Sequence, residues 1–169
     1  MSGENTQYVN YLIELSQSGR KNAYFDLCNI ILRSIFTLVF RLVKDFQLSK
    51  KITLAAFVLG WDNIKKYNKE TSFVFWIKDF AIRYSLKELE KRNRSTSNND
   101  LSKETNYALT ELEEHFFTLP DGDRLIFVLH DMDGYSYEEI ESFLPDLSVD
   151  EIKSKLIAAR EYLMDKLSL

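Results

Sequence analysis

The sequence predicts an all-α protein built from two small helical domains. Only five glycines and two prolines occur in 169 residues, and no stretch shows the strict alternation of apolar and polar residues that marks a β-strand. Hydrophobic residues make up 45% of the chain, enough for a buried core without disulfides or metal. We expect a helical bundle in residues 1–92, a linker in 93–108 and a four-helix domain in 109–169.

The long helix of the first domain is marked by apolar residues that recur every three or four positions after Tyr24: Leu27, Cys28, Ile31, Ile35, Leu38, Val39, Leu42 and Phe46. This stripe must be covered by further helices, expected at about 5–17, 50–68 and 72–92, the last with Ser72 as its N-cap. Arg33 and Arg41 interrupt the most apolar run, so we interpret it as a buried core helix and expect no membrane span.

A polar stretch separates the two domains. Residues 93–106 are rich in Ser, Thr and Asn, the composition of a flexible linker. Beyond it, three pairs fit the capping box, in which a hydroxyl and a carboxylate three residues apart bond the first amides of a helix: Thr110 with Glu113, Ser136 with Glu139, and Ser148 with Glu151. Pro120 marks a fourth helix start. The expected core of this domain is Leu112, Phe116, Phe117, Leu119, Leu125, Val128 and Leu129.

The charges divide unevenly at the linker. Residues 1–92 hold 15 Lys and Arg against 9 Asp and Glu, a charge of +6, and residues 109–169 hold 5 against 15, a charge of −10. Such asymmetry indicates different partners for the two domains, and the first is the better candidate for binding a polyanion.

Catalytic and metal-binding patterns are not visible. His115 and His130 have no evident carboxylate or cysteine partner, and two Asp-x-Asp pairs, at 121 and 131, lack the twelve-residue loop of a calcium site. We therefore expect no enzyme activity, metal or cofactor. The single cysteine, Cys28, cannot form an internal disulfide and the N-terminus lacks a secretory signal, so a cytoplasmic protein is expected.

The second half resembles the two-domain sigma factors of bacterial RNA polymerase, the extracytoplasmic-function class. Members carry Leu-Pro before a helix, Arg four residues on, a Gly-x-Ser-Tyr-x-Glu-Ile signature and a second helix resembling Val-Lys-Ser-Arg-Leu. The matching positions here are Leu119, Pro120, Arg124, Gly134, Ser136, Tyr137, Glu139, Ile140 and the run 152–160. The resemblance implies that residues 134–163 form a helix-turn-helix.

The first half is similar to the same family through shorter motifs. Gly19, Ala23 and an aromatic residue at 24 or 25 match its opening pattern, while Phe57 and Trp61 match a Phe and Trp one helical turn apart. Residues 75–81 resemble the family's Trp-Leu-x-x-Ile-Ala. The resemblance thus covers nearly the whole chain.

The resemblance implies a transcription initiation subunit whose partners are core RNA polymerase, promoter DNA and an anti-sigma factor. The implied polymerase contacts are Lys51, Leu54, Ala55, Phe57 and Trp61. Aromatic and basic residues suit a melted strand, while a helix suits the major groove. The implied DNA contacts are Trp76, Arg83, Lys87, Lys91 and Arg92 in the first domain, and Lys153, Lys155 and Arg160 in the second.

Three departures leave alternatives open. Lys51, Leu54 and Ala55 replace polar residues of the family's polymerase-binding surface, and Arg83 and Lys87 replace an Asn and an Asp. Glu141 stands where the family has an alanine after the Glu-Ile pair, and Asp150 and Glu151 lie at the start of the second helix; these carboxylates either cap helices or oppose phosphates. Trp76 is either a base platform or core.

Two hypotheses on function follow. In the first, the chain is a divergent sigma factor that recruits polymerase to promoters. In the second, it keeps the sigma fold but has lost DNA binding, and acts as an anti-sigma decoy or adaptor. The acidic second domain and the altered residues at 51, 54 and 55 motivate the second hypothesis. An unrelated helical regulator is a third, weaker alternative.

Overall fold

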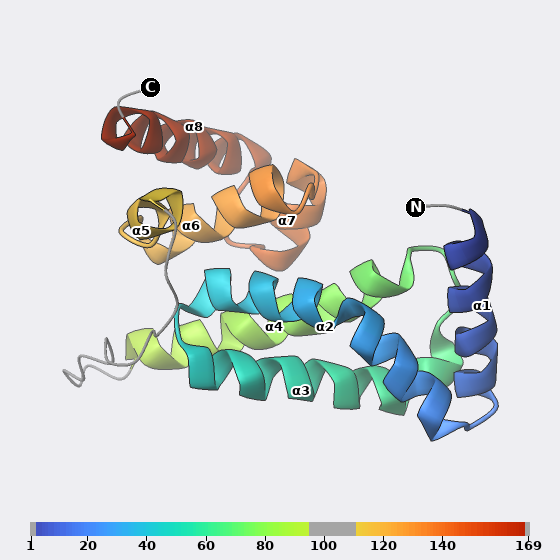
Figure 1. The fold of residues 1–169 in the computed structure, drawn as a ribbon. Coiled ribbons are helices and arrows are strands. Elements are labelled where there is room, and N and C mark those ends of the chain that lie inside the picture. Colours follow the sequence, from blue (N-terminus) through green and yellow to red (C-terminus); the bar gives the residue numbers. More distant parts are fainter. Residues whose placement is uncertain (1–2, 95–110, 168–169) are drawn as a thin grey trace. The chain divides into compact units, whose positions relative to one another are not determined.

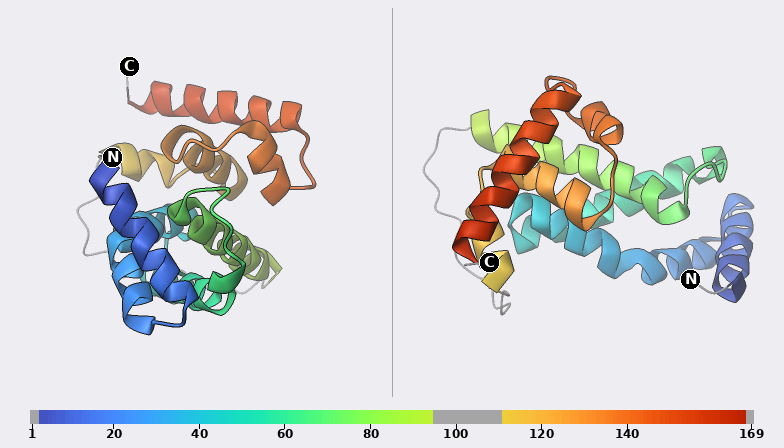
Figure 2. Two further views of the ribbon diagram at one scale, coloured as in Figure 1. Left: turned by 90° about the vertical axis from the view of Figure 1, so that its right-hand side faces the viewer. Right: turned by 90° about the horizontal axis from the view of Figure 1, so that it is seen from above.

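A computed structural model describes residues 3–94 and 111–167, with side chains from residue 6 in the first stretch and from residue 113 in the second. All regular structure in these ranges is helical, which confirms the predicted fold class (Figures 1 and 2). The chain divides into two compact units, Met1–Val39 with Gln47–Glu90 and Phe40–Phe46 with Lys91–Leu169. Most of the predicted linker, residues 95–108, lies outside the described residues, so the exact domain bounds stay a prediction.

The first four helices are α1 (Gly3–Gln17), α2 (Lys21–Val43), α3 (Phe46–Asn63) and α4 (Phe73–Arg94), with a 3-10 turn, η1 (Ile64–Lys66), after α3. Helices α2, α3 and α4 run alongside one another, and α1 stands across one end of them (Figure 1). The predicted stripe on α2 is buried from Leu27 to Leu42. The prediction that Phe46 belongs to this helix is wrong. α2 ends at Val43 because Lys44 takes a left-handed φ of 55°, and Phe46 is the first residue of α3.

Side-chain bonds fix the ends of these helices. The Gln17 amide at the end of α1 donates to the carbonyls of Ile64 (3.1 Å) and Tyr67 (2.8 Å), which joins α1 to η1. The Ser72 hydroxyl accepts the Phe75 amide at 3.4 Å, so the predicted N-cap of α4 is confirmed. α1 thus ends at the predicted residue and α4 begins after the predicted cap, whereas α3 runs over Phe46–Asn63 and not over the predicted 50–68.

The second unit contains α5 (Glu111–Phe116), α6 (Asp121–Phe127), a π-helical turn η2 (Val128–Met132), α7 (Tyr137–Phe143) and α8 (Val149–Lys166). Pro120 directly precedes α6, one residue before the helix begins. All predicted core residues from Phe116 onward are buried, and the side chain of Leu112 lies outside the described set. The Thr110 half of the first predicted capping box also lies outside the described residues.

Two capping boxes build the helix-turn-helix. Ser136 and Glu139 bond each other's backbone amides at the start of α7, and Ser148 and Glu151 do the same at the start of α8, as predicted. Gly134 has a φ of +77°, a region that glycine enters at no steric cost, which lets the chain turn from η2 into α7. The Gly-x-Ser-Tyr-x-Glu-Ile signature thus encodes a turn, a cap and, through the fully buried Ile140, a core contact.

Candidate functional site

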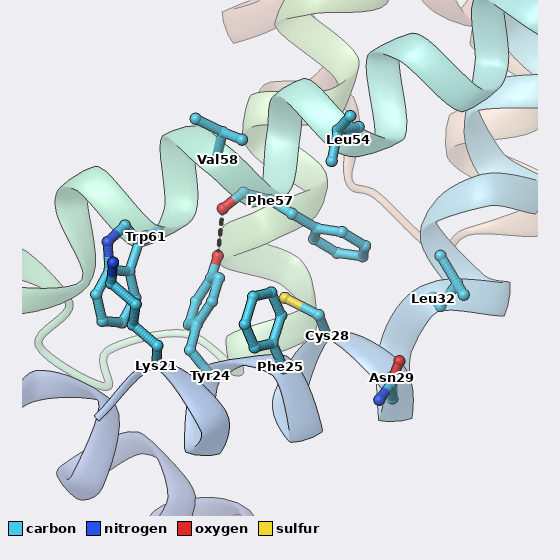
Figure 3. Close-up of a pocket in the computed structure, with 10 residues that line it drawn as sticks. All are labelled: Lys21, Tyr24, Phe25, Cys28, Asn29, Leu32, Leu54, Phe57, Val58 and Trp61. Atoms are coloured by element: carbon cyan, nitrogen blue, oxygen red, sulfur yellow. Dashed lines mark hydrogen bonds between the residues drawn. The ribbon is translucent and has the colours of Figure 1, made fainter. Parts of the chain in front are cut away.

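An apolar groove lies between α2 and α3 in the first unit. It has a volume of about 450 Å³, and Figure 3 shows both walls. Three of the five predicted polymerase contacts, Leu54, Phe57 and Trp61, line it; Lys51 is exposed and Ala55 half-buried, and neither is a lining residue. The remaining lining residues are Lys21, Tyr24, Phe25, Cys28, Asn29, Leu32 and Val58.

The floor of the groove is neutral and rigidly held. The Tyr24 hydroxyl donates to the Phe57 carbonyl at 2.6 Å, and its ring lies 5.3 Å from that of Trp61 (Figure 3). Burial raises the pKa of the Cys28 thiol to about 11 and also raises the pKa of Tyr24. Neither group therefore ionises near neutral pH, and the floor can accept apolar side chains.

The rim of the groove exposes large apolar side chains to solvent. Phe25 is 62% exposed, Leu32 45%, Leu54 65% and Val58 52%. Clustered exposed side chains of this kind mark protein interaction surfaces. Sequence reasoning missed Phe25, Leu32 and Val58, although Phe25 and Leu32 are apolar residues seven positions apart that lie outside the buried stripe of α2.

One cation, Lys21, is among the residues that line the groove. Arg33 follows the lining residue Leu32 on α2, and Lys51 lies about one helical turn before Leu54 on α3; both are exposed and neither lines the groove. The apolar groove therefore has basic residues in and near its lining.

Helix α4 carries the nucleic-acid residues that the sequence predicts within residues 1–92. Trp76, Arg83 and Lys87 are spaced by seven and four residues, so they share one side of the helix, and Lys91 follows four residues later. Arg83, Lys87 and Lys91 are exposed, and Arg83 forms an ion pair with Asp79 at 3.0 Å. The structure thus gathers these four residues into one basic and aromatic row.

The remaining candidate DNA contact on α4, Arg92, is bound to other residues of the chain. Its guanidinium donates to the Val43 carbonyl at 3.0 Å and to Asp45 at 2.9 Å, where it closes the end of α2. Fixing this loop is the role that these bonds support for Arg92.

Trp76 belongs to an aromatic cluster. Its ring lies 4.9 Å from Tyr67, 5.9 Å from Phe73 and 5.1 Å from Phe80, measured between centroids, and its side chain is half-buried. Packing against these three rings therefore orients the indole.

All three predicted cations of α8 face carboxylates of the same unit. The Lys155 ammonium lies 2.9 Å from Asp123, and Arg160 donates two bonds to Asp131, at 2.6 and 2.8 Å. Lys153 is held more loosely, 4.0 Å from the highly exposed Asp150 and over the Tyr137 ring at 5.3 Å. Sequence reasoning missed Asp123 and Asp131, because 32 and 29 residues separate them from their partners.

Asp131 interacts with both Arg160 and His130. Hydrogen bonds from Arg160 hold the pKa of its carboxyl below the usual range, with a smaller contribution from the His130 ring, whose Nδ1 lies 2.7 Å away. The His130 ring in turn stacks on Tyr137 at 4.6 Å. The carboxylate is thus ionised at neutral pH and available to neutralise Arg160.

Arg124, the arginine four residues after the Leu119-Pro120 pair, has a structural role. It is buried, and it donates to the Leu119 carbonyl at 3.1 Å and to Asp121 at 2.7 Å. The arginine therefore ties the turn between α5 and α6 together.

The first-turn carboxylates of α8 divide into two kinds. Glu151 accepts the Ser148 amide and hydroxyl, at 2.8 and 2.7 Å, and these bonds lower its pKa. The capping interpretation is therefore confirmed for Glu151. Asp150 is 96% exposed and leaves its charge on the surface of α8.

Among the side chains of residues 6–94 and 113–167, no three of His, Cys, Asp or Glu lie close enough together to hold a metal ion. The helices described there include none whose apolar stretch could cross a bilayer.

Comparison with known proteins gives one consistent picture, although no family model matches the chain. It is 24% identical to the ECF RNA polymerase sigma-E factor of Escherichia coli, over 98% of this chain and 96% of the relative. It is also 24% identical to the RNA polymerase sigma-H factor of Pseudomonas aeruginosa, over 89% of each protein.

Two solved structures share the fold. The sigma factor RpoE of Bartonella quintana, in complex with the anti-sigma factor NepR, aligns with a TM-score of 0.65 at 15% identity, over 86% of this chain and 97% of that one. CnrH, in complex with the cytosolic domain of CnrY, aligns with a TM-score of 0.62 at 19% identity, over 95% of this chain and 97% of that one. The chain is therefore sigma-factor-like, and the sigma factors that it resembles include one of the extracytoplasmic-function class.

Proposed function

We propose that this chain is a transcription initiation subunit that binds core RNA polymerase and promoter DNA in the cytoplasm, without enzymatic activity of its own. The observation that carries the proposal is its similarity, along 98% of its length, to a protein named as a sigma factor. The helix-turn-helix built by two capping boxes supports it. These relatives favour a sigma factor over the adaptor alternative.

The α2–α3 groove is our proposed polymerase contact. Leu54, Phe57 and Trp61 would receive apolar side chains of the polymerase, and Lys51 and Ala55 would border that contact. An amphipathic helix fits a groove of this kind, because its apolar face enters the trough while its polar face stays in water. Lys21 in the lining favours a partner with carboxylates beside its apolar residues.

DNA contacts are proposed on both units. Trp76, Arg83, Lys87 and Lys91 offer a base-stacking ring and a row of cations, the combination that holds a single strand. On α8, Lys153 is the most accessible cation, whereas Lys155 and Arg160 must leave their carboxylates to meet phosphates. Arg92, bound to Asp45, has to break its pair in the same way.

An anti-sigma factor is a further proposed partner. Both structural neighbours were solved as complexes, one of them with a protein named as an anti-sigma factor. The exposed rim of the α2–α3 groove is available for such a protein when polymerase is absent.

The decisive test of the proposed function is assembly with polymerase. We expect the purified chain to co-elute with core RNA polymerase in gel filtration, and the mixture to form open complexes on candidate promoters from the same genome. A folded chain that does neither would show that it is not a sigma factor.

Changing Lys153 to Ala should weaken duplex binding with a shallower salt dependence. Each phosphate contact contributes about 0.9 to the slope of log affinity against log salt, so the slope should fall by about that amount. Fluorescence anisotropy of labelled promoter DNA over a range of NaCl concentrations measures it. Lys166→Ala, at the other end of α8, is the matched control and should leave the slope unchanged. An unchanged slope for Lys153→Ala would mean that this part of α8 does not face the duplex.

A further inference from the structure

Two cations of α8, one on each flank of the helix, form ion pairs with carboxylates from other helical elements of the same unit. Lys155 is paired with Asp123 of α6, and Arg160 with Asp131 of η2. Only 21% of each of these two carboxylate side chains is exposed, whereas the cations remain 42% and 44% exposed. The two carboxylate side chains are thus more buried than the cations with which they pair.

Helix geometry places these pairs on the two flanks of α8, between its buried row and its outward face. At about 100° per residue, Lys155 and Arg160 lie on opposite sides of the buried row formed by Ile152, Leu156 and Ala159. The outward face carries Asp150, Ser154, Ile157, Glu161 and Asp165, all exposed. Lys153, at the margin of this face, is the cation left to approach a phosphate.

A cation in such a pair contributes little to DNA binding. While the carboxylate holds it, the cation neutralises no phosphate and therefore releases no counterion from the DNA. Charge-assisted bonds at 2.6 to 2.9 Å must also be broken first. The bidentate Arg160 pair costs more to open than the single Lys155 bond.

We infer that Asp123 and Asp131 set the strength with which α8 binds duplex DNA, by holding Lys155 and Arg160 away from the phosphates. The inference rests on the proposed function, because it assumes that α8 meets DNA. Under it, the free chain binds a duplex weakly, and α8 needs polymerase and the first unit to hold it against the promoter. The two aspartates act as affinity-limiting residues.

The test uses the full chain and a fluorescein-labelled mixed-sequence duplex, titrated over a range of NaCl concentrations. Asp123→Asn keeps the shape of the side chain and removes its charge, which releases Lys155. We expect a steeper salt slope, by about 0.9, and about five- to tenfold tighter binding at roughly 0.1 M salt. The double variant with Asp123→Asn and Lys155→Ala should lose this gain, because the released cation is gone.

A second arm and a matched control keep the result interpretable. Asp131→Asn, alone and combined with Arg160→Met, repeats the design on the other flank of α8. This pair of variants replaces the first if circular dichroism shows that Asp123→Asn is unfolded. Asp146→Asn removes an exposed charge from the turn before α8 and should leave the slope unchanged. A gain that persists in the double variants, or no gain in either aspartate variant, would overturn the inference. Failure of the proposed function would appear separately, as a wild-type chain that does not co-elute with polymerase.

Discussion

Replacing Leu54 with Asp is expected to weaken assembly with core RNA polymerase by about 30-fold while the chain stays folded. Leu54 is 65% exposed on the rim of the α2–α3 groove, so the substitution removes little buried surface. In a complex, however, the new carboxylate would be buried among apolar groups. Loss of a central interface residue costs about 2 kcal/mol or more, which corresponds to about 30-fold weaker binding. Gel filtration and a binding titration with labelled core enzyme measure the loss.

The control for this change is Tyr11→Asp on α1. Tyr11 is a large apolar side chain of similar exposure, 57%, in the same unit, but it does not line the groove. The Tyr11→Asp variant should bind polymerase as the wild type does, because the new charge lies outside the proposed groove contact. Equal binding by both variants would place the polymerase contact somewhere other than the groove.

Local patterns in the sequence predicted most of the fold. The apolar stripe from Leu27 to Leu42 has the period of a helix and is buried, and the hydroxyl and carboxylate pairs at 136 and 148 cap the helices as expected. The error at Phe46 arose because the apolar spacing continues across the junction, while the backbone turns at Lys44. Periodicity reports which residues are buried, and it does not report where one helix ends and another begins.

The candidate sites were less accessible to sequence reasoning. Lys155 and Arg160 were assigned to DNA from their sign and their place on α8, but their carboxylate partners lie on elements about thirty residues earlier and meet them only in the folded unit. Half of the apolar groove belongs to α2, where Phe25 and Leu32 do not continue the buried stripe. Spacing within one helix predicts a face, whereas a site made by two helices depends on their packing.

A substitution at Gly60 should have the second large effect, on the stability of the first unit. At this position α3 lies so close to its neighbours that it has no room for a side chain. A Cβ atom at this position would overlap the Tyr24 hydroxyl and the Ile77 Cδ1 atom. Both neighbours are buried, and the hydroxyl is fixed by its bond to the Phe57 carbonyl. Overpacking of this kind costs about 1–3 kcal/mol, and displacing the Tyr24 bond adds to that cost. Alanine gains about 1 kcal/mol over glycine in a helix, which does not offset the sum.

Gly60→Ala should therefore lower the free energy of unfolding of the first unit by about 1–3 kcal/mol, and it should weaken polymerase binding, because Tyr24 and Phe57 both line the groove. Both tryptophans, Trp61 and Trp76, lie in the first unit, so urea unfolding followed by tryptophan fluorescence reports on that unit alone. Gly122→Ala in α6 is the matched control. A Cβ there meets nothing within 4 Å, so its stability, followed by far-UV circular dichroism, should be unchanged or raised by up to about 1 kcal/mol. If Gly60→Ala were as stable as the wild type, α2 and α3 could separate without cost, and the groove would not be a rigid feature of the fold.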